Sequence, residues 1–154
     1  MKRPSWQEYC SNLVQQVALR STCRRLAVGA LIVKNNVIIG TGYNGSLPGD
    51  EHCIDPGVGC LIGAHGGCIR TQHAERSALA QCTRLGIATQ DAEIYVTHFP
   101  CLDCTKQIIH SGIKRVYYMQ DYKNDPYAEQ LLSVHEIECI KIKEGAEDER
   151  CVNG

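Results

Sequence analysis

One histidine, one glutamate and two cysteines form the group of residues with the clearest chemical potential. His73 and Glu75 stand two positions apart, and Cys101 and Cys104 stand three positions apart further along the chain. Imidazole and thiolate are common zinc ligands, and zinc held by three protein ligands keeps its fourth position for water, whose pKa it lowers to about 7. The sequence therefore predicts a catalytic zinc site with His73, Cys101 and Cys104 as its ligands.

Glu75 would give such a site a group that moves protons. It is close to His73 in the sequence without having to bind the metal, so its carboxylate can take a proton from zinc-bound water and pass it to a ring nitrogen. A closed, structural zinc site is the alternative, but it needs a fourth ligand and gains nothing from Glu75. We therefore expect hydrolytic removal of an amine from an aromatic ring, with Glu75 as the catalytic residue.

The elements that must position these side chains follow regular hydrophobic patterns. Ser5 and Glu8 form a capping box at the start of the first helix, Asn35-Asn36 favours a tight hairpin turn, and both zinc motifs open a helix. A helix start favours thiolates because of its free N–H groups and its dipole. The patterns predict helices over 5–20, 73–86, 100–109 and 126–134, and strands over 28–33, 37–39, 94–97, 116–118 and 137–142.

This order of elements predicts an α/β fold, a single-domain α-β-α sandwich with a mixed five-stranded central sheet. One domain over 1–143 accounts for the regular patterns, and it includes a Gly- and Cys-rich loop over 44–71. The segment 144–154 is polar without periodicity, and we expect it to form a flexible tail.

A second group of cysteines lies in or near that loop. A loop of this length inside a compact domain normally needs a special reason, and a zinc ion would fix a segment with few apolar side chains. All-thiolate ligation by Cys23, Cys53, Cys60 and Cys68 is favoured. Two alternatives stay open, namely His65 in place of Cys60 and unligated thiols in a flexible loop.

The composition limits the partners and the compartment. The formal net charge is -1 and no Lys/Arg run occurs, so a long nucleic acid is not an expected partner. No apolar stretch has membrane-spanning length, and the N-terminus lacks the apolar segment of a signal peptide. The 10 cysteines are then expected to be thiols and metal ligands rather than disulfides, in a cytoplasmic protein.

With these motifs the chain resembles the cytidine deaminase superfamily and, within it, the deoxycytidylate (dCMP) deaminases. The order H-x-E followed by P-C-x-x-C is the signature of zinc nucleobase deaminases, and the resemblance extends from about Ser5 to Ile142. The matching stretches are RSTC (20–23), VGA (28–30), GYNG (42–45), CIRTQHAE (68–75), YVTHFPC (95–101), GIK (112–114) and DY (121–122). One departure follows HAE, where the family often has an apolar residue and then Asn, and this chain has Arg76-Ser77.

The resemblance implies an enzyme that hydrolyses dCMP to dUMP and ammonia and so supplies dUMP for thymidylate synthesis. It implies that Asn44 and Ala74 contact the substrate, Asn44 at the sugar, and that a second, structural zinc is present. It further implies a homohexamer that dCTP with Mg2+ activates and dTTP inhibits. The segment that helps to bind nucleotides in such enzymes corresponds to Gly42, Tyr43, Asn44 and Gly45.

The residues by themselves leave the substrate open. A 5′-phosphate needs cations or N–H donors, and no pattern selects among Arg24, Arg25, Arg70, Arg76 and Lys123. An adenosine or cytidine deaminase acting on RNA or another nucleoside is one alternative, although an RNA-acting enzyme predicts a basic face. A non-catalytic zinc scaffold is the other alternative, and it leaves Glu75 unexplained.

Overall fold

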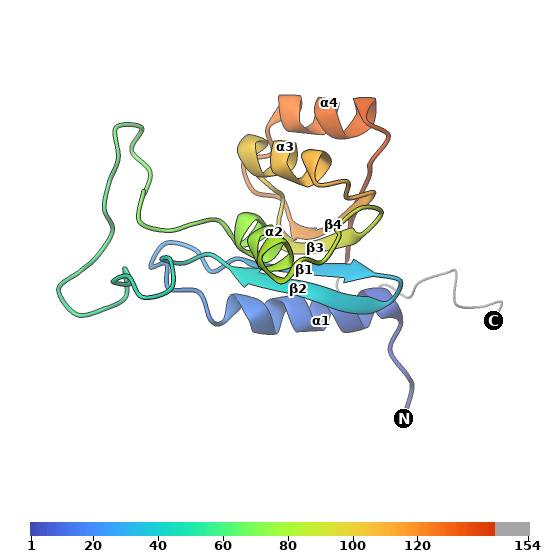
Figure 1. Ribbon diagram of the computed structural model, residues 1–154, viewed down its shortest axis with the longest axis horizontal. Helices are drawn as coiled ribbons and strands as arrows, with labels where there is room; N and C mark the ends of the chain where they lie inside the picture. Colours follow the sequence, from blue (N-terminus) through green and yellow to red (C-terminus); the bar gives the residue numbers. More distant parts are fainter. Residues whose placement is uncertain (144–154) are drawn as a thin grey trace.

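The computed structural model describes residues 1–143, so the predicted tail at 144–154 lies outside the described residues. Figure 1 shows a central sheet with helices on both of its faces, which confirms the predicted α/β sandwich. The helices are α1 (Trp6–Ala18), α2 (Ala74–Leu85), α3 (Leu102–His110) and α4 (Pro126–Val134). The strands are β1 (Gly29–Lys34), β2 (Val37–Tyr43), β3 (Glu93–His98), β4 (Arg115–Gln120) and β5 (Glu138–Lys141). None of the helices within residues 1–143 combines the length and the apolar composition of a membrane span.

The five strands form one mixed sheet in the order β2-β1-β3-β4-β5. β1 runs antiparallel to both β2 and β3, whereas β3, β4 and β5 are parallel. Asn35 and Asn36 make the predicted tight turn between β1 and β2, with φ values of 49° and 62°. β2 continues to Tyr43, beyond the predicted end at residue 39. The prediction stopped too early because glycine is a poor strand former, yet Gly40 and Gly42 keep pairing with β1.

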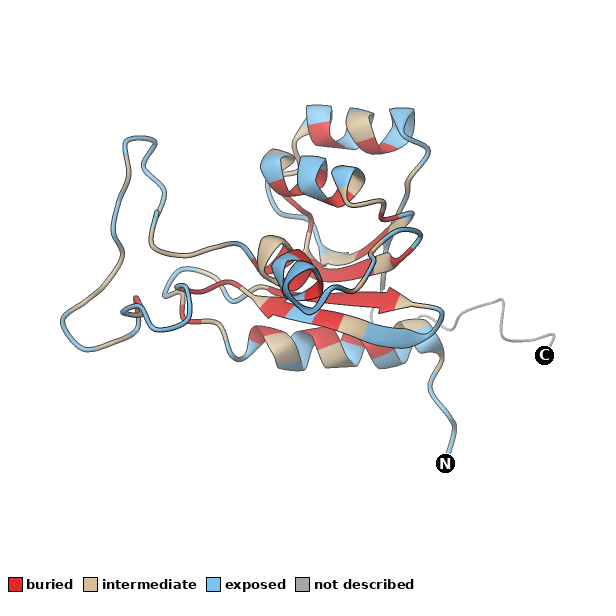
Figure 2. Cartoon of the chain, in the orientation of Figure 1, coloured by how far each residue is buried: buried red, intermediate tan, exposed pale blue. Residues whose placement is uncertain are grey.

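Alternate residues of the strands pack on opposite faces of the sheet. Leu31, Tyr95 and Tyr117 lie on the face covered by α1, where they pack with Cys10 and Val14. The other face is covered by α2, α3 and α4, and its buried residues include Ile32, Ala78, Ile94, Val96, Ile108, Val116 and Leu132. Figure 2 shows the buried residues gathered in the sheet and on the inner sides of the helices.

Four strand ends meet at one edge of the sheet. Gly29 at the start of β1 pairs with Tyr43 at the end of β2, and Ala30 pairs with Val96 near the end of β3. Because β4 is parallel to β3, it ends at the same edge. The two segments that carry the zinc motifs therefore lie close to a common edge of the sheet.

Gly42 lets α2 lie directly on β2. A Cβ atom at this position would collide with the carbonyl oxygen of Ala74 and with the backbone nitrogen of Ala78. Both atoms belong to the first turns of α2. The absence of a side chain at Gly42 therefore sets where α2 begins relative to the sheet.

A methyl group at Gly42 should push α2 away from β2. We expect the Gly42→Ala variant to lose about 1–3 kcal/mol of the free energy of unfolding, as overpacked sites do, when urea denaturation is measured. Gly67→Ala is the matched control, because a Cβ atom there meets nothing within 4 Å. Equal unfolding midpoints for the two variants would contradict the close packing of α2 on β2.

Candidate active site

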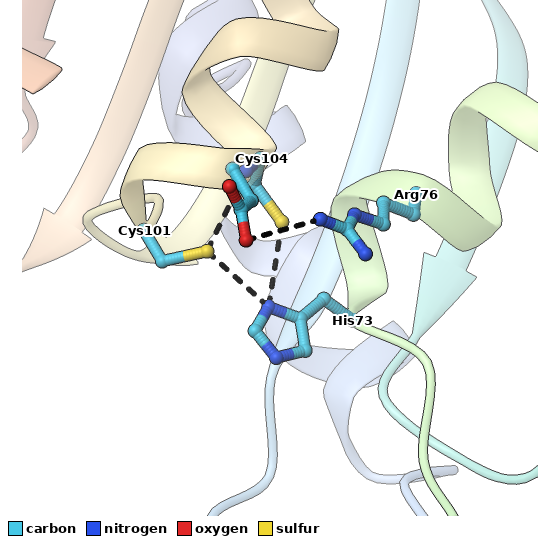
Figure 3. A network of polar contacts seen from close by, with 5 residues as sticks. His73, Arg76, Cys101 and Cys104 are labelled. Atoms are coloured by element: carbon cyan, nitrogen blue, oxygen red, sulfur yellow. Dashed lines mark hydrogen bonds and ion pairs between the residues drawn. The ribbon is translucent and has the colours of Figure 1, made fainter. Parts of the chain in front are cut away.

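The two predicted zinc motifs meet where α2 and α3 begin. His73 is the N-cap of α2 and Cys101 is the N-cap of α3, so both lie at helix starts as predicted. Nδ1 of His73 is 3.5 Å from Sγ of Cys101 and 3.4 Å from Sγ of Cys104. Figure 3 shows the three side chains pointing toward one another from the two helix starts.

The separations of these atoms fit a zinc ion. With Zn–S bonds of about 2.3 Å and Zn–N bonds of about 2.0 Å, tetrahedral geometry places S and N about 3.5 Å apart. The observed distances of 3.4 and 3.5 Å agree with that value. No fourth side chain of the described residues joins this set of donor atoms, which all lie within 4.8 Å of one another. The three donors therefore suit a site with an open fourth position.

Hydrogen bonds among the three donors shift their pKa values in opposite directions. The bond with the Cys104 thiol, together with that to the His73 ring, lowers the pKa of Cys101 to about 4. The same bond to Cys101 and burial raise the pKa of Cys104, and the charge of Arg76 acts against that rise. The bond to Cys101 also raises the pKa of His73. The cluster thus holds protons that a zinc ion would displace, because zinc needs thiolates and a neutral imidazole.

Glu75 stands beside the donor atoms rather than among them. It lies in the first turn of α2 and is 4% exposed. Burial raises the pKa of its carboxyl group, while its own N–H group and the charge of His73 act in the opposite direction. A buried carboxyl group with a raised pKa is a stronger proton acceptor than an exposed one.

Two backbone hydrogen bonds tie His73 to the end of β2. The N–H group of Gly45 donates to the carbonyl oxygen of Gln72 at 3.1 Å, and the N–H group of Gln72 donates back at 2.8 Å. Gln72 directly precedes His73, so this bridge fixes the chain immediately before the first donor. It brings the end of the long loop back to the place where that loop began.

Asn44, which the resemblance assigns to the substrate, holds the loop after α1. Its Oδ1 accepts hydrogen bonds from the N–H group of Val28 at 2.8 Å and the hydroxyl group of Ser21 at 2.5 Å. Its Nδ2 donates to the carbonyl oxygen of Leu26 at 2.7 Å, which leaves one N–H bond of the amide to spare. Ala74, the other assigned contact, is fully buried at the start of α2.

Three of the four cysteines predicted for a second zinc come together in the loop. The sulfur atoms of Cys53, Cys60 and Cys68 lie within 4.8 Å of one another, and those of Cys53 and Cys68 are 3.7 Å apart. Two thiolates on one tetrahedral zinc ion lie about 3.8 Å apart. The structure therefore places Cys60 in the cluster and leaves its alternative, His65, outside it. Cys23, the fourth predicted ligand, also lies outside this cluster.

The protein backbone favours a thiolate in this cluster. Burial raises the pKa of Cys68, but backbone groups of Arg70, Leu61 and Thr71 hydrogen-bond to its sulfur and bring the pKa down to about 7. Burial raises the pKa of Cys53 to about 11. A metal ion would compensate for that unfavourable burial of charge, because it binds thiolates directly.

The predicted phosphate candidates have different surroundings. Arg24 and Arg25 are exposed in the loop that Asn44 holds. Arg70 forms an ion pair with Glu51 at 3.6 Å, and Lys123 lies 5.5 Å from the ring centre of Tyr122. The fifth candidate, Arg76, pairs with Asp103, so Arg24 and Arg25 are the least engaged of the five.

Sequence reasoning missed one contact of the site. A terminal guanidinium nitrogen of Arg76 lies 3.7 Å from a carboxylate oxygen of Asp103. Arg76 is in the first turn of α2 and Asp103 is in the first turn of α3. Their opposite charges beside the two motifs were a signal in the sequence, but only the packing of the helix starts shows that they meet.

Three metal donors with a neighbouring buried carboxyl group are the arrangement of zinc-dependent nucleobase deaminases. Sequence comparison agrees, since residues 4–120 match the family described as "Cytidine and deoxycytidylate deaminase zinc-binding region". The chain belongs to this cytidine and deoxycytidylate deaminase family, and the predicted resemblance is confirmed.

Within this family, the similarity of the chain to individual proteins places it with the dCMP deaminases. The chain is 38% identical over 130 residues to the deoxycytidylate deaminase of Mycobacterium phage D29, covering 79% of this chain and 99% of that protein. It is 53% identical over 131 residues to "ComE operon protein 2" of Bacillus subtilis (strain 168), covering 85% and 68%. The dCMP deaminase of cyanophage S-TIM5, solved in complex with dCMP and dUMP, matches with a TM-score of 0.77 and 29% identity, covering 92% of this chain and all of that one.

The low pKa of Cys101 predicts selective alkylation of metal-free protein. A pH of 6 is above the Cys101 pKa of about 4, so Cys101 is a thiolate at that pH. Burial raises the pKa of Cys139 to about 11, so Cys139 stays protonated. Iodoacetamide should therefore label Cys101 and spare Cys139 in chelator-treated protein, as read by peptide mass spectrometry. Zinc added beforehand should protect Cys101. Equal labelling of the two cysteines would contradict this picture of the donor cluster.

Proposed function

We propose that the protein hydrolyses dCMP to dUMP and ammonia at the site formed by His73, Glu75, Cys101 and Cys104. The observation that carries the proposal is a set of three zinc donors at metal-binding separation with one buried carboxyl group beside it. The similarity to proteins named deoxycytidylate deaminase supports dCMP as the substrate. So does the shared fold of a relative that was solved with dCMP and dUMP bound.

His73, Cys101 and Cys104 would hold the catalytic zinc. When bound by three protein ligands, zinc supplies a Lewis acid that activates water at its open fourth position. The two cysteines stay near the metal because both belong to the start of α3, where the N–H group of Cys104 points to Sγ of Cys101 at 3.5 Å. That hydrogen bond favours the thiolate form of Cys101.

Glu75 would move the protons of the reaction. Its carboxylate takes a proton from the attacking water and delivers it to the ring nitrogen next to the carbon that carries the amine. A second proton, taken from the hydroxyl group that has added to the ring, passes to the amine. The carbon–nitrogen bond then breaks, ammonia leaves, and the water oxygen stays on the ring carbon as a carbonyl. The burial that raises the pKa of Glu75 suits this role, because it makes the carboxylate a stronger proton acceptor.

Backbone and amide groups near Glu75 would orient the nucleotide. The first N–H groups of a helix have no partner within that helix, so the N–H group of Ala74 can donate to a base oxygen. The remaining N–H bond of Asn44 can donate to a sugar oxygen. Both groups belong to the segments that the Gly45–Gln72 bridge joins.

We also propose a structural zinc ion at Cys53, Cys60 and Cys68, with Cys23 as the fourth ligand. The grouping of three sulfur atoms and the backbone groups around Cys68 support the first three ligands. Cys23, which lies outside that group, completes the all-thiolate set that the sequence predicts. Such an ion would crosslink a loop that contributes few residues to the core. The loop leads directly to Gln72 and His73, so a fixed loop also restrains the first ligand of the catalytic site.

Zinc content should separate the two sites. We expect about two zinc ions per chain in the purified protein by mass spectrometry of the metal, and one fewer in Cys104→Ser or Cys68→Ser. Cys139→Ser is the control, because Cys139 belongs to neither cluster, and it should keep both ions. A Cys68→Ser variant that keeps the full zinc content would remove the structural site.

Ammonia release tests the proposed reaction. Zinc-loaded protein is offered dCMP, CMP, deoxycytidine, dCTP and an adenosine-containing RNA hairpin separately, and we expect the fastest turnover with dCMP. Glu75→Gln should bind zinc normally but lose about 100- to 10,000-fold in kcat. Glu93→Gln, whose carboxylate pairs with Arg115 away from the zinc donors, is the control.

Each alternative has its own outcome in this assay. Turnover of the RNA hairpin but not of dCMP would keep the zinc chemistry and discard the substrate. No turnover of any compound by protein that carries zinc at His73, Cys101 and Cys104 would favour a scaffold. An active Glu75→Gln variant would remove the proton-transfer role of Glu75.

A further inference from the structure

Arg76 connects the two helices that share the catalytic metal donors. It lies one residue after Glu75 in the first turn of α2, and its guanidinium reaches to 3.7 Å from the carboxylate of Asp103 in the first turn of α3. Figure 3 shows the Arg76 side chain extending from α2 toward Cys104. The ion pair therefore spans the gap that the metal itself would bridge.

The two helices contribute different ligands to that metal. His73 comes from α2, and both Cys101 and Cys104 come from α3. In the described residues the two helix starts are joined at this point by the contacts of His73 with the two sulfur atoms and by the Arg76–Asp103 pair. The pair is thus placed to hold the donors at their separation when no metal is bound.

The charge of Arg76 also complements the site. Two thiolates and the carboxylates of Glu75 and Asp103 place more negative charge here than one zinc ion cancels. The guanidinium of Arg76 offsets part of this negative charge.

We propose that Arg76 is a positioning residue of the catalytic metal site, which holds the start of α3 against the start of α2 through Asp103 and stabilises the ligand set electrostatically. The proposal rests on the metal site proposed above. If Arg76 supports the metal ligands in this way, another residue must bind the phosphate of the substrate.

The competing explanation is that Arg76 and Asp103 form an ordinary solvated surface ion pair. The size of the change in metal affinity distinguishes this explanation from a positioning role. The side chains of Arg76 and Asp103 are 41% and 73% exposed. An exposed pair of this kind changes an equilibrium by at most about fivefold. Groups that orient metal ligands typically change metal affinity by about 10- to 100-fold. Metal affinity is therefore the quantity to measure.

Arg84 provides a matched control on the same helix. It lines a groove of about 550 Å³ along α2 and α3 together with Arg76. It stands eight residues further along α2, which is about 12 Å at 1.5 Å per residue. Arg84→Gln removes the same charge from the same groove at a distance from the donors.

The experiment measures zinc affinity in zinc buffers for the full-length protein and its Arg76→Gln, Arg76→Lys, Asp103→Asn and Arg84→Gln variants. Two readouts are followed, namely protein-bound zinc and the recovery of dCMP turnover as free zinc rises. For Arg76→Gln we expect half-recovery at about tenfold higher free zinc. Arg76→Lys should recover part of the affinity, and Arg84→Gln should match the wild type.

Cobalt substitution reports on the ligands without turnover. At subsaturating Co2+ the thiolate-to-metal absorption should be weaker in Arg76→Gln than in Arg84→Gln, and equal bands would overturn the proposal. Equal zinc affinity of these two variants would also overturn it and leave a surface ion pair. If Arg76→Gln fails to fold, Arg76→Lys and Asp103→Asn carry the same comparison, and wild-type affinity in both would overturn the proposal.

Failure of the proposed deaminase function would give results that differ from failure of the Arg76 proposal. Wild-type protein that binds no metal at His73, Cys101 and Cys104 would refute the proposed zinc site. Wild-type protein that binds zinc but does not turn over dCMP would refute the substrate, while the metal readouts would still decide the role of Arg76.

Discussion

A metal can join His73 to Cys101 and Cys104 only if two helix starts lie within a few ångströms of each other. The sheet brings this about. β3 ends at His98, three residues before Cys101, so the start of α3 stays at the edge of the sheet. Gly42 at the end of β2 lets the first turn of α2 rest directly on that strand, and the Gly45–Gln72 bridge fixes the chain just before His73. The position of the donors thus follows from backbone packing before any metal is bound.

The same constraint explains how a long loop can precede a precisely placed ligand. Residues 46–71 leave the body of the domain, as Figure 1 shows. Their two ends are nevertheless joined by the Gly45–Gln72 bridge, and Cys53, Cys60 and Cys68 gather the interior of the loop at one point. The sulfur of Cys68 accepts backbone hydrogen bonds from Arg70 and Thr71. The cysteine cluster therefore holds the backbone up to Thr71, two residues before His73. The loop's length therefore need not loosen the site.

Local patterns carried the sequence predictions, and tertiary contacts set their limits. Ser5 capping α1, the Asn35-Asn36 turn and the order of all nine elements within residues 1–143 follow from spacing and propensity, and the structure confirms them. The zinc motifs were equally visible because their chemistry is unusual. The hydrogen bonds of Asn44 to the loop after α1, the extension of β2 through Gly42 and the pairing of Arg76 with Asp103 were not predictable. Each of these depends on which segments the fold places side by side.

We propose that three protein donors hold a zinc ion whose fourth position is open beside Glu75. A crystal of zinc-loaded protein, measured by anomalous diffraction at the zinc absorption edge, tests it most directly. We predict a zinc peak bonded to His73 Nδ1 and to the sulfur atoms of Cys101 and Cys104, with no protein atom in the fourth position and the Glu75 carboxylate close by but unbonded. A fourth protein side chain on this zinc ion, or no peak among the three donors, would contradict the proposed open zinc site.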